Sequence, residues 1–172
     1  MMRHERIDPG AEAGWAEPSS DRVGDRMSRP ALTIREDAAA REAWSVMRSR
    51  KIRHLPVLDG DGRLVGIVTD RDLRGLVFDA SLRARLASAP AGEVTVGAVM
   101  TRGVVTTRVE TPILDAARLM HERKIGALPV LEGERVVGIF TESDALAALV
   151  EVLGAAAIPR ALRWAIATRR PA

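Results

Sequence analysis

The chain of 172 residues contains no cysteine. Disulfides, thiolate zinc sites, iron–sulfur clusters and a cysteine nucleophile are therefore excluded. The absence suits the cytoplasm, where disulfides are rare. Lysine is scarce as well, because it occurs only at Lys51 and Lys124 and arginine supplies the other basic side chains. The formal net charge is only +3, which fits ordinary solubility better than a nucleic-acid footprint.

Long hydrophobic runs are also lacking. The longest apolar stretch, residues 145–158, is interrupted by Glu151 and is too short to span a bilayer. The first ten residues, MMRHERIDPG, contain no apolar core of a signal peptide. We therefore expect a cytoplasmic protein without a membrane span. With 47% hydrophobic and 28% charged residues, the chain can still form a packed core.

An internal repeat organises the sequence. Residues 23–60 align with residues 96–133 at an offset of 73, and sixteen of the 38 aligned positions are identical. One residue is then lost, and residues 65–72 match residues 137–144 at an offset of 72. Solenoids usually need three or more units. Two copies therefore predict two half-domains that bury their apolar faces on each other.

Each copy begins with an extended apolar stretch, residues 31–34 or 104–107, and continues with a helix. Apolar side chains recur in the first helix at the i, i+3, i+4, i+7 spacing of one helical face. They are Ala40, Ala43, Trp44 and Met47, and their counterparts are Ile113, Ala116, Ala117 and Met120. In the second copy Thr111-Pro112 is a start signal, a capping residue followed by proline at the first helical position.

A β-hairpin and a second helix complete each copy. The first hairpin joins residues 55–58 to 64–69 across Asp59-Gly60-Asp61-Gly62, and aspartate–glycine pairs are typical of such turns. The second joins residues 128–131 to 136–141. The order is therefore β-α-β-β-α, twice, in an α/β fold.

The repeat divides the chain into five parts. Residues 1–22 lack periodicity and are interpreted as a flexible tail. The first repeat occupies residues 23–87, a linker residues 88–93 and the second repeat residues 94–154. Residues 155–172 form a basic C-terminal segment, in which a short amphipathic helix is plausible.

Two phrases occur in both copies at matched spacing. Lys51-Ile52-Arg53-His54-Leu55-Pro56-Val57 corresponds to Lys124-Ile125-Gly126-Ala127-Leu128-Pro129-Val130. Gly66-Ile67-Val68-Thr69-Asp70-Arg71-Asp72 corresponds to Gly138-Ile139-Phe140-Thr141-Glu142-Ser143-Asp144. With these phrases, the sequence resembles a tandem pair of CBS (cystathionine β-synthase) domains, a Bateman module, over about residues 23–153.

The resemblance implies a pseudo-twofold pair of repeats with two clefts between them. Family members bind AMP, ADP, ATP or S-adenosylmethionine there and regulate an attached or partner protein. This chain resembles the stand-alone bacterial kind. We expect a regulatory ligand rather than a required cofactor, an unidentified regulated partner, no metal and no enzymatic activity.

The Thr-x-x-Asp pairs, Thr69 with Asp72 and Thr141 with Asp144, carry the chemistry. A carboxylate can accept hydrogen bonds from the two vicinal hydroxyls of a ribose, while threonine and the helix start can face phosphate. The same pattern is a capping box, which stabilises a helix start by about 1 kcal/mol without any ligand. The two interpretations are compatible, since a cap could be exchanged for a ligand contact.

Basic side chains follow the first helix. Arg48, Arg50 and Lys51 are interpreted as cations that oppose the helix dipole. Arg53 and His54 enter the strand that borders the cleft in the family, and they could hold polyphosphate. Because Gly126 and Ala127 replace them in the second copy, we expect only the cleft with Arg53 and His54 to accept a di- or triphosphate.

Arg71 is a further candidate for phosphate contact, although Ser143 is its counterpart and a solvated arginine is the alternative. The resemblance also implies an adenine pocket from the first strand, the following helix start and the residues before Leu-Pro-Val, each combined with the Thr-x-x-Asp of the opposite repeat. The expected pocket residues are Thr33, Ala38, Ile52, Ile67, Thr106, Thr111, Ile125, Ala127 and Ile139. For the isoleucines, a plain core position is the alternative.

The helices after the hairpins carry apolar stripes, which we expect to pack a second copy into a homodimer, as the family does. They are Leu73, Leu76 and Val77, and Leu146, Leu149 and Val150. Packing within the chain is the alternative. Two rival functions remain: a structural dimerisation adaptor with empty clefts, and a protein that binds nucleic acid or a membrane surface through its arginine-rich C-terminus.

Overall fold

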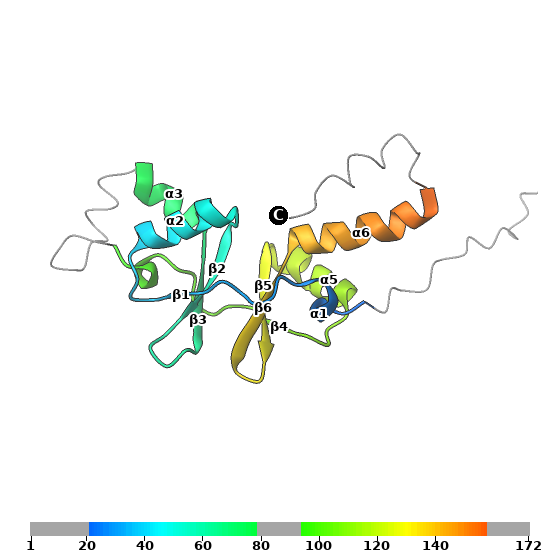
Figure 1. Ribbon diagram of the computed structural model, residues 1–172, viewed down its shortest axis with the longest axis horizontal. Coiled ribbons are helices and arrows are strands. Elements are labelled where there is room, and N and C mark those ends of the chain that lie inside the picture. The colour runs from blue at the N-terminus through cyan, green and yellow to red at the C-terminus, as the bar shows by residue number, and fades with distance from the viewer. Residues whose placement is uncertain (1–20, 79–93, 158–172) are drawn as a thin grey trace, which may run out of the picture.

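The computed structural model describes residues 21–78 and 94–157, which form two similar units side by side (Figure 1). The first contains β1 (Ile34–Arg35), α2 (Ala40–Arg50), β2 (His54–Leu58), β3 (Leu64–Thr69) and α3 (Asp70–Phe78). The second contains β4 (Thr107–Arg108), α5 (Ile113–Arg123), β5 (Ala127–Glu132), β6 (Arg135–Thr141) and α6 (Glu142–Ala157). A short helix, α1 (Val23–Arg26), and a 3-10 turn, η1 (Val96–Ala98), precede the units. The predicted α/β fold with two β-α-β-β-α repeats is confirmed.

Each unit is built on a three-stranded sheet. In the first, β2 lies between β1, which runs parallel to it, and β3, which runs antiparallel. The second sheet has the same order, β4-β5-β6, and the same strand directions. A glycine lies opposite the valine of each Leu-Pro-Val phrase, Gly66 opposite Val57 and Gly138 opposite Val130. These glycines leave room for another segment against the sheet.

The helices cover these sheets with the side chains that the periodicity indicates. Ala43 and Met47 of α2 are buried, as are Ala116 and Met120 of α5. The predicted start signal of α5 is wrong in one detail. Thr111 does not cap the helix, because Pro112 is itself the N-cap residue and the Thr111 hydroxyl accepts a bond from the Arg108 backbone N–H at 3.2 Å. None of the helices within the described ranges could cross a membrane.

The first residues of each repeat, which we name the exchanged segments, pack into the other unit. Val23 and Met27 belong to the core cluster of the second unit, although they lie at the start of the first repeat in sequence. Val96 and Met100 belong in the same way to the core cluster of the first unit. Figure 1 shows α1 beside α5, away from α2. The two repeats are therefore joined by core residues as well as by surface contacts.

Backbone hydrogen bonds repeat this exchange on both sides. Ser28 and Ile139 exchange two N–H···O bonds of 3.0 and 3.1 Å, and Thr101 and Ile67 exchange two of 3.0 and 2.9 Å. The exchanged segments therefore extend the free edges of β6 and β3. These bonds occur at equivalent positions of the repeat, so they support the expected pseudo-twofold relation.

The sequence interpretation places residues 21 and 22 in a flexible tail, but in the structure both residues contact the second unit. The Asp21 carbonyl accepts a hydrogen bond from the Ile113 N–H, and Arg22 forms a β-bridge with Pro112. Arg26 also pairs with Glu151 of α6 at 2.6 Å. The expected linker, 88–93, and most of the C-terminal segment, 158–172, lie outside the described residues; α6 itself continues to Ala157.

A methionine of each exchanged segment packs on the glycine opposite it. A Cβ at Gly138 would collide with the Met27 sulfur, and one at Gly66 would collide with the Met100 sulfur. We predict that Gly66→Ala and Gly138→Ala each lower the free energy of unfolding by about 1–3 kcal/mol, the usual cost of overpacking. Urea denaturation measures the loss.

Gly60 is the matched control for these variants. It lies in a turn, and no atom lies within 4 Å of the position that its Cβ would take. Gly60→Ala should leave stability within about 0.5 kcal/mol, as surface substitutions usually do. Equal stability of all three variants would contradict the methionine–glycine contact.

Candidate functional site

Two clefts lie between the repeats. The first, which we name the Asp72 cleft, has a volume of about 510 Å³. The second, the Asp144 cleft, has a volume of about 430 Å³. Both volumes are typical of pockets that hold small organic ligands. Each is lined by residues of both repeats, so a ligand in either cleft would touch both.

Most of the residues singled out in the sequence line these clefts. In the Asp72 cleft they are Arg53, His54, Ile67, Thr69, Arg71, Asp72, Ile125 and Ala127. In the Asp144 cleft they are Ile52, Arg53, His54, Ile139, Thr141 and Asp144. The Thr-x-x-Asp of one repeat therefore faces the isoleucine that precedes the Leu-Pro-Val strand of the other.

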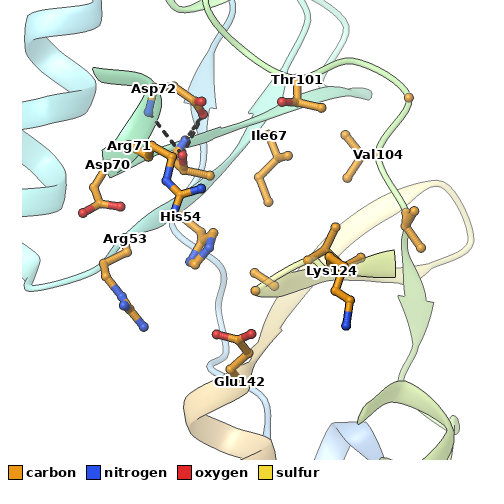
Figure 2. A pocket seen from close by; sticks show the side chains of 16 residues that line it. Arg53, His54, Ile67, Asp70, Arg71, Asp72, Thr101, Val104, Lys124 and Glu142 are labelled. Carbon is orange, nitrogen blue, oxygen red and sulfur yellow. Dashed lines mark hydrogen bonds between the residues drawn. The ribbon is translucent and has the colours of Figure 1, made fainter. Parts of the chain in front are cut away.

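Each aspartate closes a cap at the start of its helix. Asp72 Oδ2 accepts bonds from the Thr69 N–H at 2.8 Å and the Thr69 hydroxyl at 2.7 Å, while the Asp72 N–H donates to the Thr69 hydroxyl at 3.3 Å. Asp144 Oδ2 accepts the equivalent two bonds from Thr141 at 2.8 and 2.7 Å. Figure 2 shows the first cap at the top of its cleft.

These caps use one oxygen of each carboxylate. Among the described residues, none donates a hydrogen bond to Oδ1 of Asp72 or Asp144. A carboxylate offers about four acceptor positions. A ligand hydroxyl could therefore bind Oδ1 while the cap stays closed. The replacement of the cap by a ligand contact, which the sequence analysis considers, is not needed.

His54 and Arg53 line both clefts. The expectation that they distinguish one cleft from the other is therefore wrong. The reason is geometric: β2 and β5 begin next to each other, and Gly126 leaves open the space in which His54 lies. A Cβ at Gly126 would lie only 3.1 Å from His54 Nε2 and 3.5 Å from Glu142 Oε2.

The half-buried position of His54 lowers the pKa of its imidazole below the ordinary value of 6.5. Burial is the main cause, because it disfavours the charged ring, and the nearby Arg53 guanidinium acts in the same direction. The carboxylates of Asp70, Glu142 and Asp72 oppose the shift. His54 is therefore a neutral side chain between two clefts at pH 7.

Four of the expected adenine-pocket residues line neither cleft. They are Thr33, Ala38, Thr106 and Thr111. Successive side chains of an extended segment point to opposite sides, so Leu32 and Val105 face the clefts while Thr33 and Thr106 do not.

The other two positions are used by the exchanged segments. The Ala38 and Thr111 carbonyls accept hydrogen bonds from the Val96 and Val23 N–H groups, at 2.8 and 2.9 Å. These bonds hold the start of η1 and of α1 against the opposite unit.

Sequence reasoning missed several charged residues at the clefts. Lys51 and Lys124 are the C-cap residues that follow α2 and α5, both in the left-handed conformation with φ of 55° and 56°. Lysine seldom adopts this conformation, and each lysine lies on the wall of a cleft. Arg50 and Glu142 also line a cleft. The signal in the sequence that points to these two lysines is the Lys-Ile pair, which occurs at the same position of both repeats.

Within the described ranges no three histidine, aspartate or glutamate side chains are arranged to hold a metal ion. The site therefore consists of two clefts. Each combines apolar side chains, several cations and a capping aspartate of which only Oδ2 accepts hydrogen bonds from the described residues. Such a combination can bind an uncharged ring system together with a hydroxylated group.

The CBS domain family model matches residues 23–79 and 96–151, so this chain belongs to the CBS domain family, as a tandem pair. A CBS domain-containing protein of Dictyostelium discoideum is 37% identical over 133 residues, which cover 74% of this chain and 90% of that protein. The homoserine O-acetyltransferase of Methanohalobium evestigatum is 37% identical over 123 residues. The match covers 71% of this chain and only 23% of that enzyme.

Solved structures with bound ligands share the fold. CBSX2 in complex with AMP has a TM-score of 0.64 and 31% identity, and the match covers 77% of this chain and 98% of CBSX2. The CBS domain pair of protein MJ0100, in complex with 5′-methylthioadenosine and S-adenosyl-L-methionine, has a TM-score of 0.62 and 29% identity; 78% of this chain and 97% of that one are covered.

The position of His54 makes stability depend on pH. Because its pKa is lowered in the folded state, the unfolded chain binds a proton more readily than the folded one, and His54 destabilises the fold as the pH falls below 6.5. We predict that His54→Gln loses less unfolding free energy than the wild type between pH 7.5 and 5.5, measured by urea titration.

His121→Gln is the matched control, because His121 is exposed on α5. Its pH profile should follow that of the wild type. If His54→Gln also keeps the wild-type slope, the buried imidazole does not control acid sensitivity.

Proposed function

We propose that this chain is a regulatory module that binds an adenosine-containing ligand in its clefts and transmits the bound state to a partner protein. AMP, ADP, ATP and S-adenosylmethionine are the candidate ligands. The observation that carries the proposal is the free Oδ1 of Asp72 and of Asp144, each at a cleft formed by both repeats. The adenosine compounds in CBSX2 and in the MJ0100 pair support the ligand class.

The clefts offer the interactions that an adenosine group needs. Vicinal ribose hydroxyls can donate to the free carboxylate oxygen, a charge-assisted bond that is stronger than one between neutral groups. The adenine ring can lie against Ile67 and Ile125 in one cleft, and against Ile52 and Ile139 in the other. Binding of this kind requires neither a cofactor nor a catalytic residue, and we propose no reaction.

Regulation follows from the position of the ligand between the repeats. A ligand shifts a conformational equilibrium only when it binds the two states with different affinity. Since each cleft has walls from both repeats, a change in their relative position would change the affinity. The presence of a matching segment within a homoserine O-acetyltransferase suggests that the regulated partner could be an enzyme.

Ligand binding can be tested with the two aspartates. We predict that AMP, ATP or S-adenosylmethionine stabilises the wild-type chain, by about 2.7 kcal/mol at a concentration of 100 times Kd. Asp72→Asn and Asp144→Asn keep an acceptor for the helix cap but remove the charge that faces the ribose. Each should weaken binding in its own cleft by about tenfold in calorimetry.

Asp115→Asn is the matched control, because Asp115 is exposed in the first turn of α5 and lines neither cleft. It should bind all ligands as the wild type does. If no adenosine compound of the panel binds the wild-type chain, the ligand-sensing function is wrong and the dimerisation adaptor becomes the better proposal.

We also propose that the chain forms a homodimer, through one of the two expected helices. Leu73 and Leu76 of α3 are 1% and 6% exposed in the core of their own unit, so the expectation that they contact a second copy is wrong. On α6, Leu146 and Leu149 are 59% and 51% exposed and line an apolar groove of about 490 Å³ next to α5. A second copy would cover this groove with its own α5 and α6.

Association of two copies through this groove can be tested by substitution. If two copies pack through it, Leu149→Asp should place a charge in the apolar interface and convert the dimer to a monomer in analytical ultracentrifugation. Ala147→Asp, exposed on the same helix outside the groove, should remain a dimer. A wild-type monomer at micromolar concentration would rule out this assembly.

A further inference from the structure

The pseudo-twofold relation makes the two clefts directly comparable. Their ribose-facing carboxylates, Asp72 and Asp144, have the same capping bonds. Lys124 and Lys51 lie at equivalent helix ends, one in each cleft. Any difference in ligand preference must therefore come from positions at which the repeats differ.

The main difference is the number of carboxylates. Besides its capping aspartate, the Asp72 cleft contains Asp70 and Glu142, whereas the Asp144 cleft contains no further acid. Asp70 is paired with Arg74, so its charge is partly neutralised. Glu142 has no ion pair within the described part of the chain, and its carboxylate is the extra negative charge that a ligand would meet.

Glu142 reaches the Asp72 cleft because the second repeat has small residues at the start of β5. A Cβ at Gly126 would lie 3.5 Å from Glu142 Oε2, and Figure 2 shows this carboxylate pointing from the start of α6 toward His54. At the equivalent place of the first repeat lie the larger Arg53 and His54, and Asp70 does not line the Asp144 cleft.

The number of cations is the same, three in each cleft, so the carboxylates decide the balance of charge. Arg50, Lys51 and Arg53 line the Asp144 cleft and face a single carboxylate. In the Asp72 cleft, Arg53, Arg71 and Lys124 are matched by three carboxylates. Cations therefore outnumber carboxylates by two in the Asp144 cleft, whereas the two kinds of charge are equal in number in the Asp72 cleft. Coulombic attraction to a phosphate is stronger where the positive charges are in excess.

We propose that the Asp144 cleft takes an adenosine ligand that carries phosphates, whereas the Asp72 cleft takes one without phosphate, such as an adenosyl thioether. The assignment rests on the proposed adenosine binding and adds the charge class of the ligand at each cleft. A triphosphate in the Asp144 cleft meets Arg50, Lys51 and Arg53. In the Asp72 cleft it would meet Glu142, and a neutral or cationic group attached to the ribose would not be repelled there.

Calorimetry of the full chain with ATP and with 5′-methylthioadenosine tests the assignment. We expect one strong ATP site in the wild type, weakened about tenfold or more by Asp144→Asn and unaffected by Asp72→Asn. The 5′-methylthioadenosine site should show the reverse pattern. Arg50→Gln should weaken ATP about three- to tenfold without changing 5′-methylthioadenosine affinity, because it removes a cation from the Asp144 cleft only.

Glu142→Gln tests the exclusion of phosphate. It should allow a second ATP to bind, raising the stoichiometry from one toward two per chain. Arg118→Gln and Glu122→Gln are the controls, because Arg118 and Glu122 are exposed on α5 and line neither cleft. They change the net charge of the chain as Arg50→Gln and Glu142→Gln do. They should bind both ligands as the wild type does.

Two equivalent ATP sites in the wild type would overturn the assignment. So would an ATP site that is lost in Asp72→Asn and kept in Asp144→Asn, or effects of the Arg118 and Glu122 variants as large as those of Arg50 and Glu142. Each of these results leaves adenosine binding itself intact. Failure of both ligands to bind the wild-type chain would instead overturn the proposed function together with the assignment.

Discussion

The packing of Met27 on Gly138 and of Met100 on Gly66 is the contact on which the rest of the structure depends. Each methionine comes from the first residues of one repeat and lies in the core of the other unit. Only glycine leaves room for it, because any side chain there would collide with the sulfur. Paired backbone bonds between Ser28 and Ile139 continue the contact along the sheet edge. Neither unit therefore has a complete core of its own.

The clefts are a consequence of this exchange. An exchanged segment that bonds to the edge of β3 or β6 continues along one wall of a cleft, and the Thr-x-x-Asp at the end of that strand forms the other side. The cap that starts each helix uses Oδ2 and leaves Oδ1 directed to no partner in the described chain. In the proposed function, helix stability and ligand binding would therefore use different atoms of one carboxylate. A site of this kind would be preformed, because its ligand would not need to break a hydrogen bond of the protein.

Sequence reasoning recovered the fold and much of the candidate site because both depend on local, repeated patterns. Helical spacing identified α2 and α5, and the repeated Thr-x-x-Asp led directly to the cleft aspartates. It failed where a shift of one residue decides whether a side chain lines a cleft. Thr33 and Thr106 were expected there, but in an extended chain their neighbours Leu32 and Val105 point to the cleft. It also placed Leu73 on an outer surface, since an amphipathic stripe does not say which neighbour covers it.

The sequence by itself determined the duplication, the element order, the capping motif and the family resemblance, because these follow from spacing along the chain. Only the tertiary structure decided that the first residues of each repeat complete the core of the opposite unit. It also decided that Arg53 and His54 line both clefts, and that Glu142 lies in one of them. These facts concern residues about 35 to 110 positions apart in the chain, and their proximity arises only when the two units pack together.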